Sequence, residues 1–562
     1  MDHIDILDKL PKHLLNYVVE QDYNSYTAKD HAVWRYVMRR NIKYLPEVAH
    51  HSYLEGLKKT GIGMERIPNI SGMNRILGDI GWGAVTVDGF IPPNAFMEFQ
   101  ANNVLVIAAD IRSADQIEYT PAPDIIHEAA GHAPIIADPE YAEYLRLFGE
   151  IGSKAFSSSY DKKMYEAIRH LSILKADPYT PKNEIDEAEK RLQELDSRVV
   201  ANSEIALIRN LHWWTVEYGL IGTPDNPKIY GAGLLSSIGE GRSSLKPDVK
   251  KLPLTIEAVN YNFDITTRQP QLFVTPDFGH LRKVLFEFAD RMALRRGGVY
   301  GLNVAVESQS IATAVYSSGL QVSGVINNVI EKDGKPVYIS TQGPTSLNFE
   351  NCELSGHDKS YHSMGYGSVV GRLKDIGKPV ESCTDRDLSE ISIVKGRKVK
   401  LNFESGVTVE GILKNVERKK EKIILMSFSD CLVKFEDIIL FQPDWGIYDM
   451  AVGEDIISVY SGPADPDSYG IQVEPPVEKT HKISYSRKAK RLHLLYKIVR
   501  DYRNVKRLPG VLESVLAELE KQYPDEWLLA TEIFEEAIED KDESLKERVT
   551  RFLEKNGKKE SI

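Results

Sequence analysis

Long apolar runs and paired cysteines are both missing from this 562-residue chain. No stretch approaches the ~20 apolar residues that a membrane helix requires, and the N-terminal MDHIDILDKL has no apolar core of signal-peptide length. The three cysteines, Cys352, Cys383 and Cys431, form no CxxC pair, which argues against a disulfide framework and a thiolate zinc site. The sequence therefore predicts a cytoplasmic protein that does not bind membranes.

An excess of basic residues is missing as well. The formal net charge is −12, with 27% charged and 42% hydrophobic residues. An acidic chain has no general attraction for nucleic acid, because the phosphate backbone is itself negative. We therefore expect no nucleic-acid partner. The length is sufficient for several domains of ordinary size.

The periodicity of apolar residues changes twice along the chain. Residues 1–305 have helical spacing with short strand-like runs, whereas 310–480 contain alternating segments such as KVKLNFESGVTVEGI, typical of a β-hairpin. From about residue 484 the spacing is helical again. We therefore predict a mainly α domain with short strands (1–305), a β-rich domain (310–480) and a helical C-terminal domain (484–562).

The segment HEAAGH at residues 127–132 resembles the HExxH helix of zinc hydrolases with one residue inserted. On a regular α-helix, His127 and His132 would point about 140° apart and could not share one ion. Gly131 can adopt left-handed backbone angles and Pro134 cannot continue a helix. We therefore expect the helix to end near Gly131, so that the chain turns His132 back toward His127.

Two imidazoles need a third ligand to hold a metal ion. Two histidines with one carboxylate form the facial triad typical of oxygen-activating non-haem iron(II). Glu128 follows His127 directly and should point away from it, so Glu217 in LHWWTVEYGL is the better candidate. A carboxylate buried among aromatic residues needs a cation or hydrogen-bond donors. Asp124 is a candidate to orient a ligand histidine. Two alternatives stay open: His127 paired with an acid, and Glu217 as a solvated helix residue.

Further motifs occur around these residues. They are YTAKDHAVW (26–34), ERIPNIS (65–71), YTPAPDIIHEAAGHAP (119–134), WWTVEYGL (213–220) and IYGAGLLSSIGE (229–240). In this order, over residues 20–300, they resemble the pterin-dependent aromatic amino acid hydroxylases, particularly the bacterial phenylalanine hydroxylases. The resemblance implies a hydroxylase-like fold for the mainly α domain.

The resemblance also implies the chemistry of the site. His127, His132 and Glu217 would bind iron(II), and tetrahydrobiopterin or a related tetrahydropterin would react there with dioxygen. The implied reaction is ring hydroxylation of an aromatic amino acid, L-phenylalanine to L-tyrosine, with tyrosine or tryptophan as alternative substrates. The implied substrate-binding residues are Arg112, Thr120, Pro123, Trp213, Gly233 and Ser236, and the implied pterin-binding residues are Gly89, Ile91, Phe96 and Glu128.

The chain departs from the family pattern in three places. Pro92 and Pro93 replace residues expected to be polar in the pterin loop, which leaves the contacts of that loop in doubt. The interval between His132 and Glu217 is unusually long, which indicates a helical insertion at about 155–200. We interpret this insertion as an inert surface hairpin; a lid or an oligomer contact is the alternative. The last 250 residues lie outside the resemblance, and a homo-oligomer contact is one role for them.

Two other functions are alternatives to hydroxylation. A zinc hydrolase would have histidines four residues apart with the intervening glutamate as general base, so the observed spacing counts against it. A non-catalytic binding protein with a degenerate hydroxylase domain would not need an intact set of His127, His132, Glu217 and Arg112.

Overall fold

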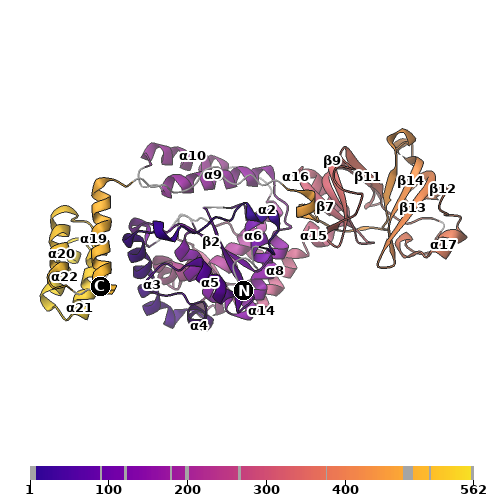
Figure 1. The fold of residues 1–562 in the computed structure, drawn as a ribbon. Helices are drawn as coiled ribbons and strands as arrows, with labels where there is room; N and C mark the ends of the chain where they lie inside the picture. Colours follow the sequence, from indigo (N-terminus) through magenta and orange to yellow (C-terminus); the bar gives the residue numbers. More distant parts are fainter. Residues whose placement is uncertain are drawn as a thin grey trace.

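The computed structural model describes residues 8–88, 91–118, 123–176, 180–196, 202–263, 268–374, 376–471, 485–504 and 508–558. Three groups of elements follow one another across the molecule (Figure 1). The mainly helical N-terminal part lies in the middle, the β-rich part at one end and the C-terminal helices at the other. The coarse order predicted from periodicity, helical then β-rich then helical, is therefore confirmed.

The N-terminal part surrounds its core with helices. The longest, α3 (Ala28–Val48), begins at a capping box in which Thr27 and Asp30 satisfy each other's backbone amides. Its residues Val33, Trp34 and Val37 are fully buried. The other α-helices before the site are α2 (Lys12–Leu15), α4 (His51–Lys59), α5 (Ile70–Gly78) and α6 (Pro93–Ala101). Those after it are α7 (Ala133–Ile136), α8 (Pro139–Gly152), α9 (Ser159–Ala176), α10 (Lys182–Asp196), α11 (Glu204–His212), α12 (Ala232–Ser236), α13 (Ile238–Ser244) and α14 (Phe278–Ala289).

Two small sheets complete this part. Strands β1 (Gly83–Val87) and β2 (Val104–Ala108) form a fully buried parallel pair joined through α6. The second sheet has the order β4-β3-β6-β5, and its strands are β3 (Leu220–Thr223), β4 (Asn226–Ile229), β5 (Lys250–Pro253) and β6 (Gln271–Thr275). Short 3-10 turns lie at Tyr23–Ser25, Ala114–Gln116 and Ile256–Asn260.

The β-rich part consists of two sheets. The first contains β7 (Ile311–Tyr316), β8 (Leu320–Lys332), β9 (Lys335–Phe349), β10 (Cys352–Glu353), β11 (Gly365–Val369) and β17 (Ile456–Ser461). The second contains β12 (Lys398–Asn402), β13 (Val407–Lys419), β14 (Lys422–Phe435), β15 (Ile438–Phe441) and β16 (Tyr448–Ala451). The predicted hairpin is the β12–β13 pair, with Leu401 opposite Val409. Its alternating residues Val399, Leu401 and Val407 are buried, which explains the period of two.

Helices also flank this part. They are α15 (Ala293–Arg296), α16 (Gly298–Ser308), α17 (Asp385–Glu390) and α18 (Pro466–Tyr469), with 3-10 turns at Val380–Ser382 and Pro443–Trp445. Leu302 and Ala305 of α16 share a core with Tyr316 and Val459 of the first sheet. Helix α16 thus packs with the β-rich part, although the sequence prediction placed residues up to 305 with the helical one.

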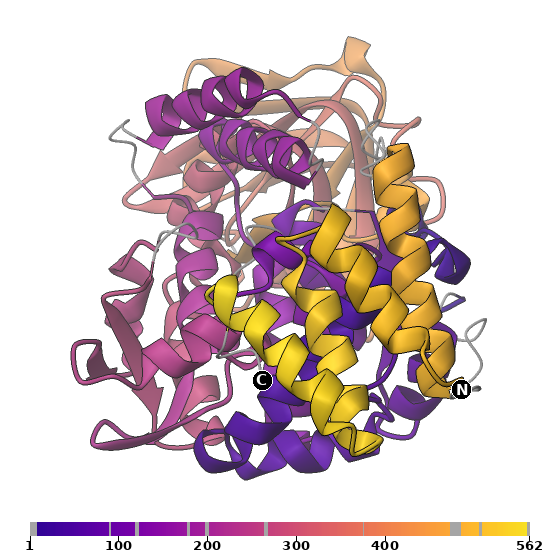
Figure 2. The same cartoon turned by 90° about the vertical axis from the view of Figure 1, so that its left-hand side faces the viewer.

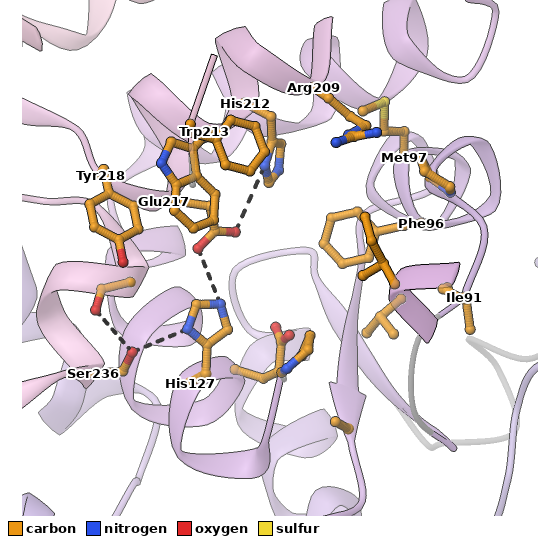
Figure 3. A pocket seen from close by; sticks show the side chains of 18 of the residues that line it. Ile91, Phe96, Met97, His127, Arg209, His212, Trp213, Glu217, Tyr218 and Ser236 are labelled. Atoms are coloured by element: carbon orange, nitrogen blue, oxygen red, sulfur yellow. Dashed lines mark hydrogen bonds and ion pairs between the residues drawn. The ribbon is translucent and has the colours of Figure 1, made fainter. Parts of the chain in front are cut away.

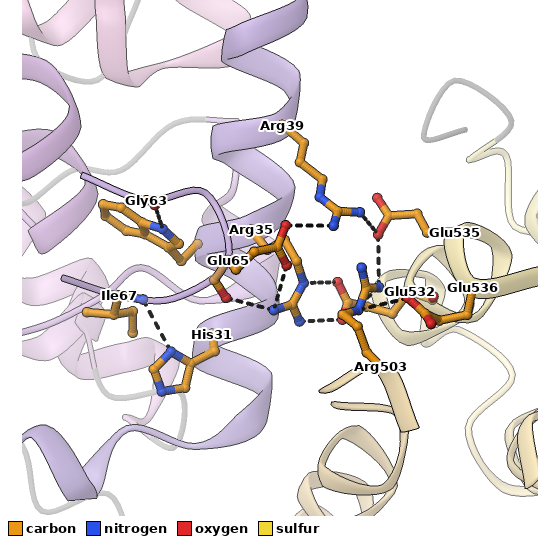
Figure 4. A network of polar contacts seen from close by, with 11 residues as sticks. His31, Arg35, Arg39, Gly63, Glu65, Ile67, Arg503, Glu532, Glu535 and Glu536 are labelled. Carbon is orange, nitrogen blue, oxygen red and sulfur yellow. Dashed lines mark hydrogen bonds and ion pairs between the residues drawn. The ribbon is translucent and has the colours of Figure 1, made fainter. Parts of the chain in front are cut away.

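The C-terminal helices α19 (Arg487–Asn504), α20 (Val511–Gln522), α21 (Trp527–Glu539) and α22 (Glu543–Lys555) lie against the N-terminal part (Figures 1 and 2). Their residues Tyr496 and Leu529 belong to the same hydrophobic core as Trp34 of α3. At this contact the guanidinium of Arg35 pairs with Glu532 through two hydrogen bonds, one of them 2.8 Å from Nε to Oε1 (Figure 4). Both side chains are almost fully buried.

Further arginines and glutamates extend this network from the buried pair to half-buried positions. Arg39 pairs with Glu535, which also accepts a 3.0 Å hydrogen bond from Arg503 of α19. The Arg503 Nε lies 3.1 Å from the buried carboxylate of Glu536. Arg503, one of the basic residues of α19, is therefore paired within the chain. No helix in the described ranges is long and apolar enough to cross a membrane.

Candidate active site

The two histidines of HEAAGH are brought together by a π-helical turn, His127–His132. The amide of Ala133 donates to the carbonyl of Glu128, five residues back. This bonding pattern widens the turn, so residues five apart in the sequence lie on the same face of the helix. The rings of His127 and His132 are therefore in contact. The expectation that the helix ends at Gly131 is therefore wrong: the chain continues directly into α7.

Gly131 has a different role from the one predicted. It does not adopt left-handed angles. A Cβ atom at Gly131 would lie 2.6 Å from the carbonyl oxygen of Ala232 in α12. The glycine is therefore required by the close approach of α12, the helix that ends with Ser236.

Glu217 also lies on a π-helical turn, Trp213–Glu217, in which the amide of Tyr218 donates to the carbonyl of Trp213. The turn directs the Glu217 carboxylate toward the ring of His127 (Figure 3). Its Oε2 lies 3.1 Å from the Nε2 of His127, and its Oε1 lies 3.2 Å from the Nε2 of His132. The two Nε2 atoms are 3.1 Å apart. Four potential ligand atoms thus face one point.

A second carboxylate reaches the same cluster. The Glu128 Oε2 lies 3.8 Å from the Nε2 of His132, and Glu128 can form a metal-binding group with both histidines. The expectation that its side chain points away from the cluster is wrong, because the π turn changes the direction of successive side chains. The structure therefore offers two carboxylates for one metal position, of which Glu217 is the closer to both imidazoles.

The electrostatics of this cluster favour a positive charge. Burial by itself would lower the pKa of His127, but Glu217, Glu128 and Asp124 outweigh it and raise the pKa to about 9. Burial would raise the pKa of Glu217, but the two histidines hold it well below its ordinary value. Burial raises the pKa of Glu128. A cation bound here would meet one carboxylate that is already ionised.

Asp124 holds an arginine rather than a histidine ring. Its carboxylate accepts 2.8 Å hydrogen bonds from both Nε and Nη2 of Arg112, and both side chains are buried. It also accepts from the backbone amide of His127 at 2.9 Å. The His127 ring instead contacts Ser236, with 3.1 Å between Nδ1 and Oγ. Asp124, which the sequence predicted to orient a ligand histidine, thus contacts the backbone of His127, whereas the side chain that contacts its ring is Ser236.

A pocket of about 300 Å³ opens beside the cluster. Most of the residues that the sequence singled out line it: Ile91, Phe96, Arg112, Pro123, His127, Glu128, Trp213, Glu217, Gly233 and Ser236. His132, the third member of the cluster, does not line the pocket and is almost completely buried. Thr120 and Gly89 lie outside the described residues.

Comparison with known proteins agrees with this arrangement. The chain matches the family of biopterin-dependent aromatic amino acid hydroxylases over residues 15–172 and 182–329. It belongs to this family.

Several individual proteins are similar to this chain. Phenylalanine-4-hydroxylase of Chromobacterium violaceum is 28% identical over 270 residues, which cover 47% of this chain and 76% of that protein. The Pseudomonas aeruginosa enzyme of the same name is 29% identical over 273 residues, 48% of this chain and 86% of that protein. Tryptophan 5-hydroxylase of Xenopus laevis is 26% identical over 325 residues, 56% of this chain and 58% of that protein. A crystal structure of the C. violaceum enzyme with iron(III) and 7,8-dihydrobiopterin has 27% identity and a TM-score of 0.39, covering 49% of this chain and 86% of that one.

This hydroxylase pocket also contains polar residues that the sequence did not single out. His212 lines it, and burial lowers its pKa to about 4, so its ring is neutral near pH 7. Glu240 lines it as well and hydrogen-bonds the hydroxyl of Tyr218. Burial raises the pKa of Glu240 to about 6. Glu240 is the last residue of the motif IYGAGLLSSIGE, and His212 directly precedes the motif WWTVEYGL. These positions were the available signal.

One of the two inserted helices, α9, forms part of the hydroxylase pocket. Tyr165 and Ile168 of α9 line it together with Arg209 of α11. Helices α9 and α10 run antiparallel across the N-terminal part (Figure 1). The interpretation of residues 155–200 as an inert surface hairpin is therefore wrong, because one of its helices contributes directly to the wall.

Proposed function

We propose that this chain hydroxylates the ring of an aromatic amino acid, with L-phenylalanine converted to L-tyrosine as the preferred reaction. The site would use one non-haem iron(II), tetrahydrobiopterin or a related tetrahydropterin, and dioxygen. The observation that carries the proposal is the convergence of His127, His132 and Glu217 at the end of an apolar, aromatic-lined pocket.

The residues fit an iron ion. Ligand atoms bonded at about 2.1 Å to one ion in octahedral geometry lie about 3 Å apart. The spacings of 3.1–3.2 Å among the histidine nitrogens and Glu217 oxygens agree with this value. We assign the ligand set to His127, His132 and Glu217, since Glu128 is farther from His132. When bound, iron and the pterin supply the activation of dioxygen.

Ser236 would fix the tautomer of the first ligand. Its hydroxyl donates a 2.8 Å hydrogen bond to the carbonyl of Ala232 and is then able to accept one from Nδ1 of His127. A neutral His127 protonated on Nδ1 presents an unprotonated Nε2 to the metal. This contact gives Ser236 a positioning role in addition to its place in the pocket wall.

Arg112 would bind the carboxylate of the amino acid substrate. Asp124 accepts from Nε and Nη2 of the guanidinium, and Nη1 donates a 3.3 Å hydrogen bond to the carbonyl of Ser236. The second N–H of Nη1 is the donor that we assign to the substrate carboxylate. A guanidinium held in this way loses little conformational freedom on binding. We place Thr120 and Gly233 near the same end of the substrate.

The walls of the pocket would separate the substrate ring from the pterin. Trp213 stacks on Phe263 at 4.2 Å between ring centroids, and with Pro123 it forms an apolar face for the substrate ring. On another wall Phe96 stands edge-on to His212 and offers a stacking surface for the pterin. Ile91, Gly89 and Glu128 complete our proposed pterin contacts. Excluding water from this pocket protects the oxidant.

The reaction is tested directly by product analysis. Purified protein with iron(II), tetrahydrobiopterin and oxygen is offered phenylalanine, tyrosine and tryptophan separately. We expect tyrosine from phenylalanine at the highest kcat/KM. Tryptophan or tyrosine hydroxylation at higher kcat/KM would reassign the substrate, and oxygen-independent activity with zinc would indicate hydrolysis instead.

The remaining parts of the chain have a supporting role in this proposal. We divide it into a hydroxylase domain (1–305), a β-rich domain (310–480) and a helical C-terminal domain (484–562), with α16 at the end of the first domain packed on the second. A homo-oligomer would use those faces of the C-terminal helices that are not packed on α3. Leu494 and Ile538 are exposed on these helices. Sedimentation of the full chain measures its oligomeric state.

We place the protein in the cytoplasm. Its three cysteines form no disulfide, as is usual in a reducing compartment.

A further inference from the structure

A second group of histidines lies in the β-rich part, beyond the end of the family match at residue 329. His357 and His362 are in the connection between β10 and β11 of the first sheet. Asp449 is on β16 of the second sheet, opposite Ser427 of β14. None of these residues lines the hydroxylase pocket.

The distances in this group suit a single metal ion. The Nδ1 of His357 and the Nε2 of His362 are 3.3 Å apart, and one ligand atom from each of His357, His362 and Asp449 lies within 4.8 Å of the others. Two nitrogens bonded at about 2.0–2.1 Å to one tetrahedral ion are separated by about 3.3 Å. The rings therefore already have the spacing that such an ion requires.

The surroundings hold the three side chains in place. The Asp449 carboxylate is almost buried and accepts hydrogen bonds from Ser427 Oγ at 2.6 Å and from the Tyr361 hydroxyl at 3.1 Å. The His362 ring stands edge-on to Tyr361, with centroids 4.7 Å apart. Partners of this kind orient metal-binding carboxylates and imidazoles.

The backbone of the connection is fixed as well. The amide of Leu347 donates to the carbonyl of His357 at 3.0 Å, and the amide of Thr345 donates to that of His362 at 3.2 Å. Both histidines are thus tied to β9, while Asp449 belongs to the other sheet. An ion bound by all three would link the two sheets.

We propose that His357, His362 and Asp449 bind one divalent transition-metal ion of the zinc class, separate from the hydroxylase site. Two imidazoles and one carboxylate suit such an ion, and three protein ligands leave a fourth position for water. The ion joins the β10–β11 connection to β16 and stabilises the contact between the sheets. The rival explanation for the short nitrogen–nitrogen distance is a direct hydrogen bond between two neutral imidazoles.

Elemental analysis after zinc loading and dialysis tests the proposal. The full chain carrying His127→Ala and His132→Ala, which removes the first metal site, is expected to retain one zinc per chain. Adding His362→Ala should remove it, whereas adding His51→Ala, an exposed histidine outside both groups, should not. The site would be excluded if the variant with His127→Ala and His132→Ala retained no zinc. It would also be excluded if adding His362→Ala left the amount of zinc per chain unchanged.

A second variant, Asp449→Asn, keeps the test valid if the His362→Ala variant does not fold. Asp449→Asn keeps the size of the side chain but is a poor zinc ligand. We expect it to weaken zinc affinity by more than the about 10–100-fold that follows loss of an outer-shell partner. Zinc should raise the Tm of the parent and not of Asp449→Asn. Equal affinity and equal Tm response in both proteins would support the imidazole–imidazole hydrogen bond and exclude the metal site.

Discussion

At the scale of single residues, Gly131 decides whether α12 can approach the histidine turn. Gly131→Ala would place a methyl group 2.6 Å from the carbonyl oxygen of Ala232, and overpacking of this kind costs about 1–3 kcal/mol. We expect a lower free energy of unfolding and weaker iron binding. Gly72→Ala is the matched control, because Gly72 lies on the exposed face of helix α5 with no atom near the new Cβ. A gain of up to about 1 kcal/mol is expected there. Equal unfolding midpoints for the two variants would contradict the packing argument.

Arg112 gives a second prediction at this scale. Arg112→Lys keeps a positive charge beside Asp124 but loses the planar fork. If the guanidinium binds the substrate carboxylate, loss of a charge-assisted hydrogen bond of about 1.5–3 kcal/mol raises the KM for the amino acid about 10- to 100-fold. Iron content should stay at the wild-type level. Steady-state kinetics with metal analysis measures both, and an unchanged KM would remove Arg112 from the substrate site.

The sequence predicted these residues better than it predicted their contacts. His127, His132 and Glu217 converge as expected. The partnership of Asp124 with Arg112 depends on tertiary packing, because no local pattern tells a capping aspartate which side chain it will also meet. Glu128 was expected to point away from His127 because neighbouring side chains on an α-helix diverge. This reason does not hold on the π-helical turn that the structure shows.

At the scale of elements, helix α9 contributes to substrate choice. Ile168→Ala removes apolar surface from the pocket wall, and one side chain of this size changes kcat/KM by about tenfold or more. We expect the change to differ between phenylalanine and tryptophan, since the enlarged pocket favours the larger ring. Glu166→Ala, on the exposed face of the same helix, should leave both values unchanged. If Ile168→Ala and Glu166→Ala had identical kcat/KM values for each substrate, helix α9 would have no part in substrate choice.

Periodicity explains which elements were predictable. The β12–β13 hairpin follows from strict alternation, because one face of the pair is buried and the other is not. The two π turns could not be found in this way, because a bulge of one extra residue leaves the helical spacing on either side intact. The spacing of five residues between His127 and His132 is the sign of the first π turn in the sequence. It led instead to the incorrect expectation that the helix ends at Gly131.

At the scale of the whole molecule, the C-terminal helices and the hydroxylase part share a buried ion pair. Arg35→Ala would leave the Glu532 carboxylate buried without its main partner, at a cost of about 3–5 kcal/mol. Arg548→Ala breaks the exposed pair with Glu520 and should cost no more than about 1 kcal/mol. Urea unfolding followed by tryptophan fluorescence compares them. Similar small losses in both variants would show that the two parts are stabilised independently of this contact.

Iron content of two matched glutamine variants tests the central claim most directly. Glu217→Gln and Glu128→Gln each neutralise one carboxylate near the histidines without changing its size. After anaerobic loading with iron(II) and desalting, we predict close to one iron per chain in the wild type and in Glu128→Gln, and almost none in Glu217→Gln. Full iron occupancy in Glu217→Gln, or its loss in Glu128→Gln alone, would contradict the assignment of His127, His132 and Glu217 as the ligands.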